Sequence, residues 1–219
     1  MASHWRTAAW GLAVVLATAT SACAVGAGAG EVKSDRLNLQ SCWDGPFDLG
    51  PNFFAGVPYR ESFQIRIQRG DDVEEVSDGL SVLIDDVHEI RGDNGMASLL
   101  GIPLEVGLPP EVTPPGVPIT PSASPPKVSM ALYLHNTCFQ TNSALYAVGG
   151  VITFESLFNG DPNETNAEQK LTSAVFEVDV ADPRNQPPEG GPVPDALKSR
   201  VTGWFRFYFE RGQPAQPFP

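Results

Sequence analysis

The sequence predicts an all-β protein, a β-sandwich of about eight or nine short strands joined by loops rich in proline and glycine. Several segments alternate apolar and polar residues with the period of two that a half-buried strand requires. Glycine and proline number 21 each among 219 residues, and no segment after the first 30 residues shows strong helical periodicity. An immunoglobulin-like or similar sandwich is the leading architecture, and a barrel is the second.

The N-terminal half carries four predicted strands. In the clearest of them Phe63, Ile65 and Ile67 alternate with polar residues, so one face is expected to be buried and the other wet. The next strand loses its alternation at residues 85–86 and resumes after a bulge. The fourth contains Pro103, which is typical of an edge strand. These strands span residues 37–42, 62–69, 80–90 and 102–108.

A proline-rich segment separates the two halves. Eight prolines fall within residues 109–126, which predicts an extended crossover between sheets, with recruitment of a proline-binding partner as the alternative. In the C-terminal half, Gly149 and Gly150 predict a hairpin turn, and a single strand with a glycine bulge is the alternative. The strand segments of this half are residues 128–137, 144–154, 174–180 and 200–211.

The last strand carries a candidate binding surface. Its phenylalanines fall on one side, whereas Trp204, Arg206 and Tyr208 fall next to one another on the other side. Exposed aromatic side chains in such a row can stack on sugar rings or anchor a protein partner. These three residues are therefore a candidate surface for a protein or glycan partner. A strand covered on both faces by loops is the alternative.

The sequence contains no complete catalytic or metal-binding motif. His88 and Glu89 begin a zinc-protease pattern that fails because position 92 is glycine. The sequence has no nucleophile elbow, phosphate-binding loop or dinucleotide fingerprint, so we predict no catalytic residue, no metal site and no cofactor. Two alternatives stay open: a hydrolase that uses His88 or paired acids, and a calcium-dependent binding module built on residues 71–78 or 161–166.

The charge balance excludes one class of partner. The chain has 26 acidic residues against 14 lysines and arginines, a net charge of −12. It lacks the basic footprint of a nucleic-acid-binding domain, so we predict no nucleic-acid partner. Acidity of this degree also opposes binding to anionic lipid surfaces, so a membrane anchor would have to be a covalent lipid.

The first residues have the order of an export signal. Arg6 precedes an apolar run at residues 8–19, about a dozen residues where a membrane-spanning helix needs about 20. Small residues then lead directly to Cys23. This arrangement resembles the signal peptide of bacterial lipoproteins, in which the cysteine thiol carries lipid and cleavage falls before the cysteine. Thr20 departs from the aliphatic residue that is usual at its position.

The resemblance implies a signal peptide at residues 1–22 and a membrane anchor at Cys23, acylated with chains such as palmitate. Because residue 24 is alanine, it further implies the outer membrane. Ordinary secretory cleavage after Ala24 is the alternative. We expect a flexible tether at residues 23–34 and one domain at residues 35–219. The predicted role is a lipid-anchored, non-catalytic binding or structural module of the cell envelope.

Two cysteines remain besides Cys23. An even pair in an exported chain predicts one disulfide, between Cys42 and Cys138. It would close a loop of about 100 residues, for which the chain-entropy model gives about 4–5 kcal/mol of stabilisation. Two separate buried thiols are the alternative.

Overall fold

The computed structural model describes residues 28–70, 77–108, 126–139, 144–185, 187 and 192–210. Residues 1–27, with Cys23, lie outside this range, so the signal peptide and the lipid anchor stay predictions. Most of the acidic segment 71–78 and of the proline-rich segment 109–126 also lies outside the described residues.

Strands dominate the described residues, and this confirms the all-β prediction. Two short helices, α1 (Val87–Arg91) and α2 (Ala167–Lys170), and three 3₁₀ turns accompany them. The ten strands are β1 (Gly28–Leu39), β2 (Trp43–Asp48), β3 (Phe53–Tyr59), β4 (Ser62–Gln68), β5 (Asp78–Ile84), β6 (Leu104–Glu105), β7 (Val128–Leu134), β8 (Ala144–Ser156), β9 (Leu171–Ala181) and β10 (Lys198–Tyr208).

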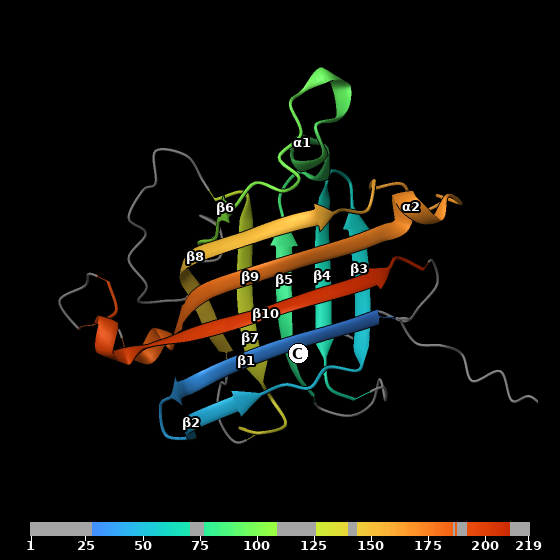
Figure 1. Ribbon diagram of the computed structural model, residues 1–219. Helices are drawn as coiled ribbons and strands as arrows, with labels where there is room; N and C mark the ends of the chain where they lie inside the picture. The colour runs from blue at the N-terminus through green and yellow to red at the C-terminus, as the bar shows by residue number, and fades with distance from the viewer. Residues whose placement is uncertain are drawn as a thin grey trace, which may run out of the picture.

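All ten strands belong to a single antiparallel sheet that folds over itself. Nine strands follow the order β2-β1-β10-β9-β8-β7-β5-β4-β3, and β6 pairs with β8. Figure 1 shows two layers, in which β8, β9, β10, β1 and β2 cross the direction of β7, β5, β4 and β3. The predicted layered packing is therefore present, but the layers are halves of one sheet, whereas immunoglobulin-like domains have two separate sheets.

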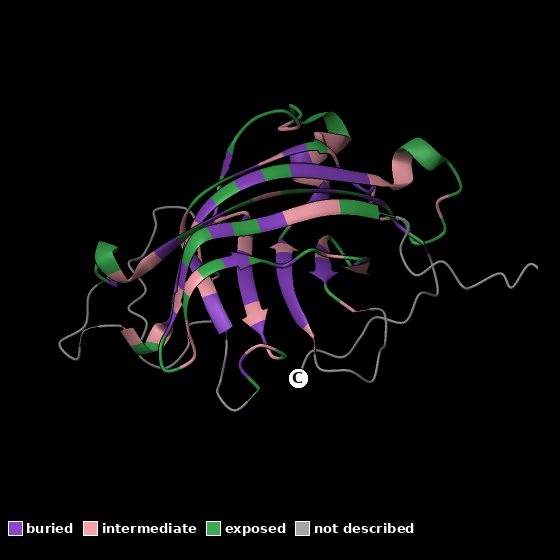
Figure 2. Ribbon diagram, turned by 60° about the horizontal axis from the view of Figure 1, so that its bottom comes forward, coloured by how far each residue is buried: buried purple, intermediate pink, exposed green. Residues whose placement is uncertain are grey.

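The core lies between the two layers. Buried and exposed residues alternate along β9 and β10, as the sequence pattern predicts (Figure 2). Strand β4 differs, because Arg66 and Gln68 on its predicted wet face are only 6% and 7% exposed, so that prediction is wrong. The largest side chains of the core are phenylalanines from both layers, among them Phe63 of β4 and Phe205 of β10, both fully buried. Phe158 stacks on Phe209 with ring centroids 4.2 Å apart, and Phe63 packs on Phe158 at 5.1 Å.

Strand β8 carries the chain from one layer to the other. Its first residues pair with β7 and the rest pair with β9, with a register shift between Ala147 and Gly149. The predicted hairpin at Gly149 and Gly150 is therefore wrong, and the alternative, one strand with a glycine bulge, is confirmed. Gly150 has φ 108°, and a Cβ there would lie 2.4 Å from the carbonyl oxygen of Glu177, so this bend requires glycine.

The expected tether at residues 23–34 is wrong for its second half, because β1 already begins at Gly28 and pairs with β10. The glycines there serve close packing. A Cβ on Gly28 would lie 2.7 Å from the ring of Phe54, and one on Gly30 would lie 2.8 Å from the carbonyl oxygen of Trp204.

Helix α1 replaces the strand that was expected to resume after residues 85–86. The Asp86 carboxylate accepts hydrogen bonds from the backbone N–H groups of His88 and Glu89, at 2.8 and 3.1 Å, and so caps the helix. Val87 and Ile90, three positions apart, are both buried by this turn of helix.

The predicted disulfide is present. Cys42 and Cys138 are bonded, with Cα atoms 5.8 Å apart. Cys42 follows β1 in one layer and Cys138 follows β7 in the other, so the bond joins the two layers.

Candidate functional site

The three residues predicted to form a binding surface lie together on the outer side of β10. Trp204 is 42% exposed and Tyr208 38% exposed, and Arg206 between them is also exposed. Phe205 and Phe207 point the other way and are buried in the core. The alternative of a strand covered on both sides does not hold for β10.

Neighbouring strands extend this surface. Trp204 lies between Glu31 of β1 and Val175 of β9, in register with both. Val175 in turn pairs with Thr153 of β8. Val175 is 47% exposed and Val151, two residues before Thr153, is 40% exposed. We call the outward side of β8, β9, β10 and β1 around Trp204 the β10 face.

Sequence reasoning missed the two valines. A signal was present, because Val175 stands between the inward-facing residues Ala174 and Phe176, in the phase where a strand of this kind normally has a polar residue. An apolar residue in the outward phase predicts an exposed apolar side chain.

Ion pairs border the β10 face on one side. Arg200 Nε lies 2.6 Å from the Asp179 carboxylate, and Arg200 also bonds Glu177. These hydrogen bonds, first that to Asp179, raise the pKa of the Arg200 guanidinium. Lys33 Nζ lies 2.8 Å from Glu31, and this hydrogen bond raises the pKa of Lys33. Both cations therefore keep their charge at neutral pH beside the exposed aromatics.

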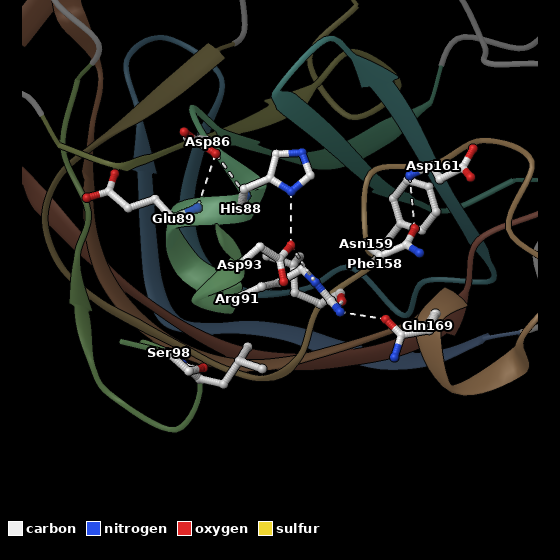
Figure 3. A network of polar contacts seen from close by, with 12 residues as sticks. Asp86, His88, Glu89, Arg91, Asp93, Ser98, Phe158, Asn159, Asp161 and Gln169 are labelled. Carbon is white, nitrogen blue, oxygen red and sulfur yellow. Dashed lines mark hydrogen bonds and ion pairs between the residues drawn. The ribbon is translucent and has the colours of Figure 1, made fainter. Parts of the chain in front are cut away.

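The second candidate centre surrounds His88 on α1 (Figure 3). His88 Nδ1 and Asp93 Oδ2 are 2.9 Å apart. Arg91 donates hydrogen bonds to the Leu157 carbonyl and, across to α2, to the Gln169 side chain. The polar groups of this cluster thus connect α1, the segment after β8 and α2, and so hold these three segments together.

Carboxylates of the acidic loop at residues 161–166 accept hydrogen bonds from backbone N–H groups of the same loop. Glu164 accepts hydrogen bonds from the N–H groups of Asn166 and Thr165, and these, first that of Asn166, lower the pKa of its carboxyl. Asp161 accepts from the N–H of Asn163 at 2.8 Å. Within the described ranges, no three His, Cys, Asp or Glu side chains are grouped so that they could hold a metal ion. Most of the other acidic run, residues 71–76, lies outside those ranges.

In the parts of the chain that the structure describes, no helix combines the length and the apolar character needed to cross a membrane. Comparison of the chain with protein-family models, with curated proteins and with solved structures found no match.

Proposed function

We propose that this protein is a lipid-anchored binding module of a bacterial cell envelope, which holds a glycan on its β10 face and does not catalyse a reaction. The observation that carries the proposal is the exposure of Trp204 and Tyr208 on a rigid, paired strand. Side chains on such a strand are pre-organised, so little conformational entropy is lost when a ligand binds.

The pattern of the face favours a glycan over a protein partner. The exposed apolar side chains are separated by polar and charged residues: Arg206 follows Trp204, Glu177 opposes Val151, and Glu31 opposes Trp204. The centre of a protein–protein interface is depleted of Glu, Asp and Lys, so Glu31 and Glu177 argue against a protein partner there. A sugar ring, with an apolar face and hydroxyl groups around its edge, matches aromatic rings interleaved with hydrogen-bonding groups.

A panel of soluble oligosaccharides, neutral and acidic, tests the proposal by isothermal titration calorimetry. We expect Trp204→Ala to weaken the binding of the recognised chain at least about ten-fold, since a central aromatic anchor commonly contributes that much. Tyr59→Ala is the matched control, because Tyr59 is an aromatic side chain, 68% exposed, on β3, a strand that does not belong to the β10 face. Equal loss in both variants, or no saccharide bound by the wild type, would contradict the glycan assignment.

The absence of catalysis is tested with the same chains. We expect them to be recovered intact after long incubation with the protein. Cleavage that disappears in His88→Ala would overturn this part of the proposal and establish the hydrolase alternative. His88 is the natural residue to change because it lies beside Asp93, a carboxylate able to orient it as a base.

The anchor is tested by the intact mass of the protein from the membrane fraction. A chain that begins at Cys23 and carries acyl groups is the expected result, since several chains together hold stably to a bilayer. A chain beginning at Val25 in the soluble fraction would replace the anchor with ordinary secretion, while the binding surface would remain as described.

A further inference from the structure

A cavity of about 280 Å³ opens between β1 and β10, next to the β10 face. Backbone pairing of the two strands ends at Lys33 and Thr202. Beyond this point β1 shifts its register against β2, between Ser34 and Leu37, and the Asn38 N–H donates to the Ser199 hydroxyl at 2.8 Å. The strands therefore separate where the cavity lies, and both contribute to its wall.

The wall of this cavity has the opposite charge balance to the rest of the chain. Acidic residues outnumber basic ones in the protein, 26 to 14. Among the ten residues that line the cavity, four are basic and one, Asp35, is acidic. The basic residues are Lys33, Arg36, Lys198 and Arg200.

Each of these cations is held by a carboxylate outside the cavity lining. Arg36 Nε lies 2.7 Å from Asp44, Lys198 Nζ lies 2.6 Å from Asp195, and Lys33 and Arg200 have the partners given above. Most of these charges are well exposed, and exposed pairs are worth little, so a ligand can share the cations at small cost.

Ser34 supplies an independent sign of a ligand. This residue lines the cavity and is 6% exposed, and its Oγ has no hydrogen-bond partner among the described residues. A buried hydroxyl without a partner is costly and therefore rare. Ser199 Oγ accepts the bond from Asn38, so its hydroxyl hydrogen can still be donated. Hydroxyl and cationic donors together suit an oxygen anion.

The cavity continues the β10 face. Thr202 lines it and stands two residues before Trp204 on the same side of β10, and Lys33 is bonded to Glu31, the register partner of Trp204. We infer that this cavity is a subsite for a carboxylate carried by the glycan that lies on the β10 face. The inference rests on the proposed function and adds that the glycan is acidic.

Titration calorimetry of the purified protein tests this with two oligosaccharides of equal length, one containing glucuronic acid and one containing glucose in its place. We expect the acidic chain to bind about ten-fold more tightly, the worth of one charge-assisted hydrogen bond. Arg200→Gln should abolish this preference. Arg60→Gln, which removes the same charge on the distant β3–β4 turn, should keep it.

Ser34→Ala separates binding from folding. Because it removes a buried hydroxyl without a partner, the variant should unfold at an equal or higher temperature than the wild type while it loses affinity for the acidic chain. Equal affinity of the wild type for both chains, with a loss in Trp204→Ala, would overturn the acidic subsite and leave the proposed function intact. Absence of binding by either chain would overturn both.

Discussion

The two outward faces of the sheet differ in how far their side chains are exposed. On the β10 face, Val175 and Trp204 are 47% and 42% exposed. On the outward side of β3, β4, β5 and β7, four residues in register are only 6–7% exposed although they point away from the core between the layers: Ala55, Arg66, Ser81 and Ala131. We call this second surface the covered face. One face exposes apolar groups, and the other buries a guanidinium.

The two faces also differ in the kind of side chain that they bury. Arg66 lies among small residues, and its burial lowers the pKa of the guanidinium to about 10. Tyr133, on the same face, responds in the opposite sense, because burial raises the pKa of its phenol. The covered face thus encloses its own polar groups. The β10 face leaves aromatic and aliphatic groups in contact with water, the arrangement expected where a ligand covers them.

The disulfide should give the largest effect, because it joins the layers that carry the two faces. A Cys42→Ser/Cys138→Ser variant is expected to lose about 4 kcal/mol of unfolding free energy, measured by urea denaturation. Reductant should lower the stability of the wild type to a similar degree and leave the variant unchanged, which serves as the control. If reductant left the unfolding free energy of the wild type unchanged, the prediction that the disulfide stabilises the protein would be wrong.

Arg66 and Arg206 place the same side chain on the two faces, buried on one and exposed on the other. Arg66→Ala should lower the free energy of unfolding by about 2–3 kcal/mol, because the packing of a long, buried side chain is lost. Arg206→Ala, the same change on the β10 face, should stay within about 0.5 kcal/mol of the wild type. Both values come from the same urea titration. Equal effects would mean that the two faces do not differ in their contribution to stability.

Much of the fold was predictable because alternation is a local property. Phe63, Ile65 and Ile67 all enter the core as the pattern predicts, and so do the phenylalanines of β10. The path of β8 and the role of Gly28 were not predictable, since both depend on residues far away in the sequence. Gly28 lies in a segment rich in glycine and alanine, which is typical of a flexible linker. In the fold it lies against the ring of Phe54 of β3, which leaves no room for a side chain.

The candidate site was likewise predictable only in part. Period-two alternation alone placed Trp204, Arg206 and Tyr208 on one side of a strand. The cavity could not be foreseen, because Lys33 and Arg200 come from opposite ends of the chain and the opening exists only where β1 leaves β10. Exposure was equally hidden: Arg66 and Arg206 both occupy outward positions in alternating strands, yet one is buried and the other exposed.

The smallest expected effect concerns pH and involves the covered face alone. His135 follows β7 and stacks on Tyr133, with ring centroids 5.4 Å apart. Burial lowers the pKa of His135 below its ordinary 6.5, partly opposed by the charge of Asp78. Between the lowered pKa and 6.5 the unfolded chain binds more protons than the folded one. The protein should therefore lose stability as the pH falls through this window.

His135→Gln removes this proton binding from both states, so its melting temperature should fall less than that of the wild type between pH 7 and pH 5. Parallel curves for the two proteins would contradict the assignment. Glycan affinity of the same variant tests whether the covered face and the β10 face are independent. Because His135 belongs to the layer behind the β10 face, the substitution should leave affinity unchanged at both pH values. A shared change in affinity and stability would show that the two faces are coupled through the core.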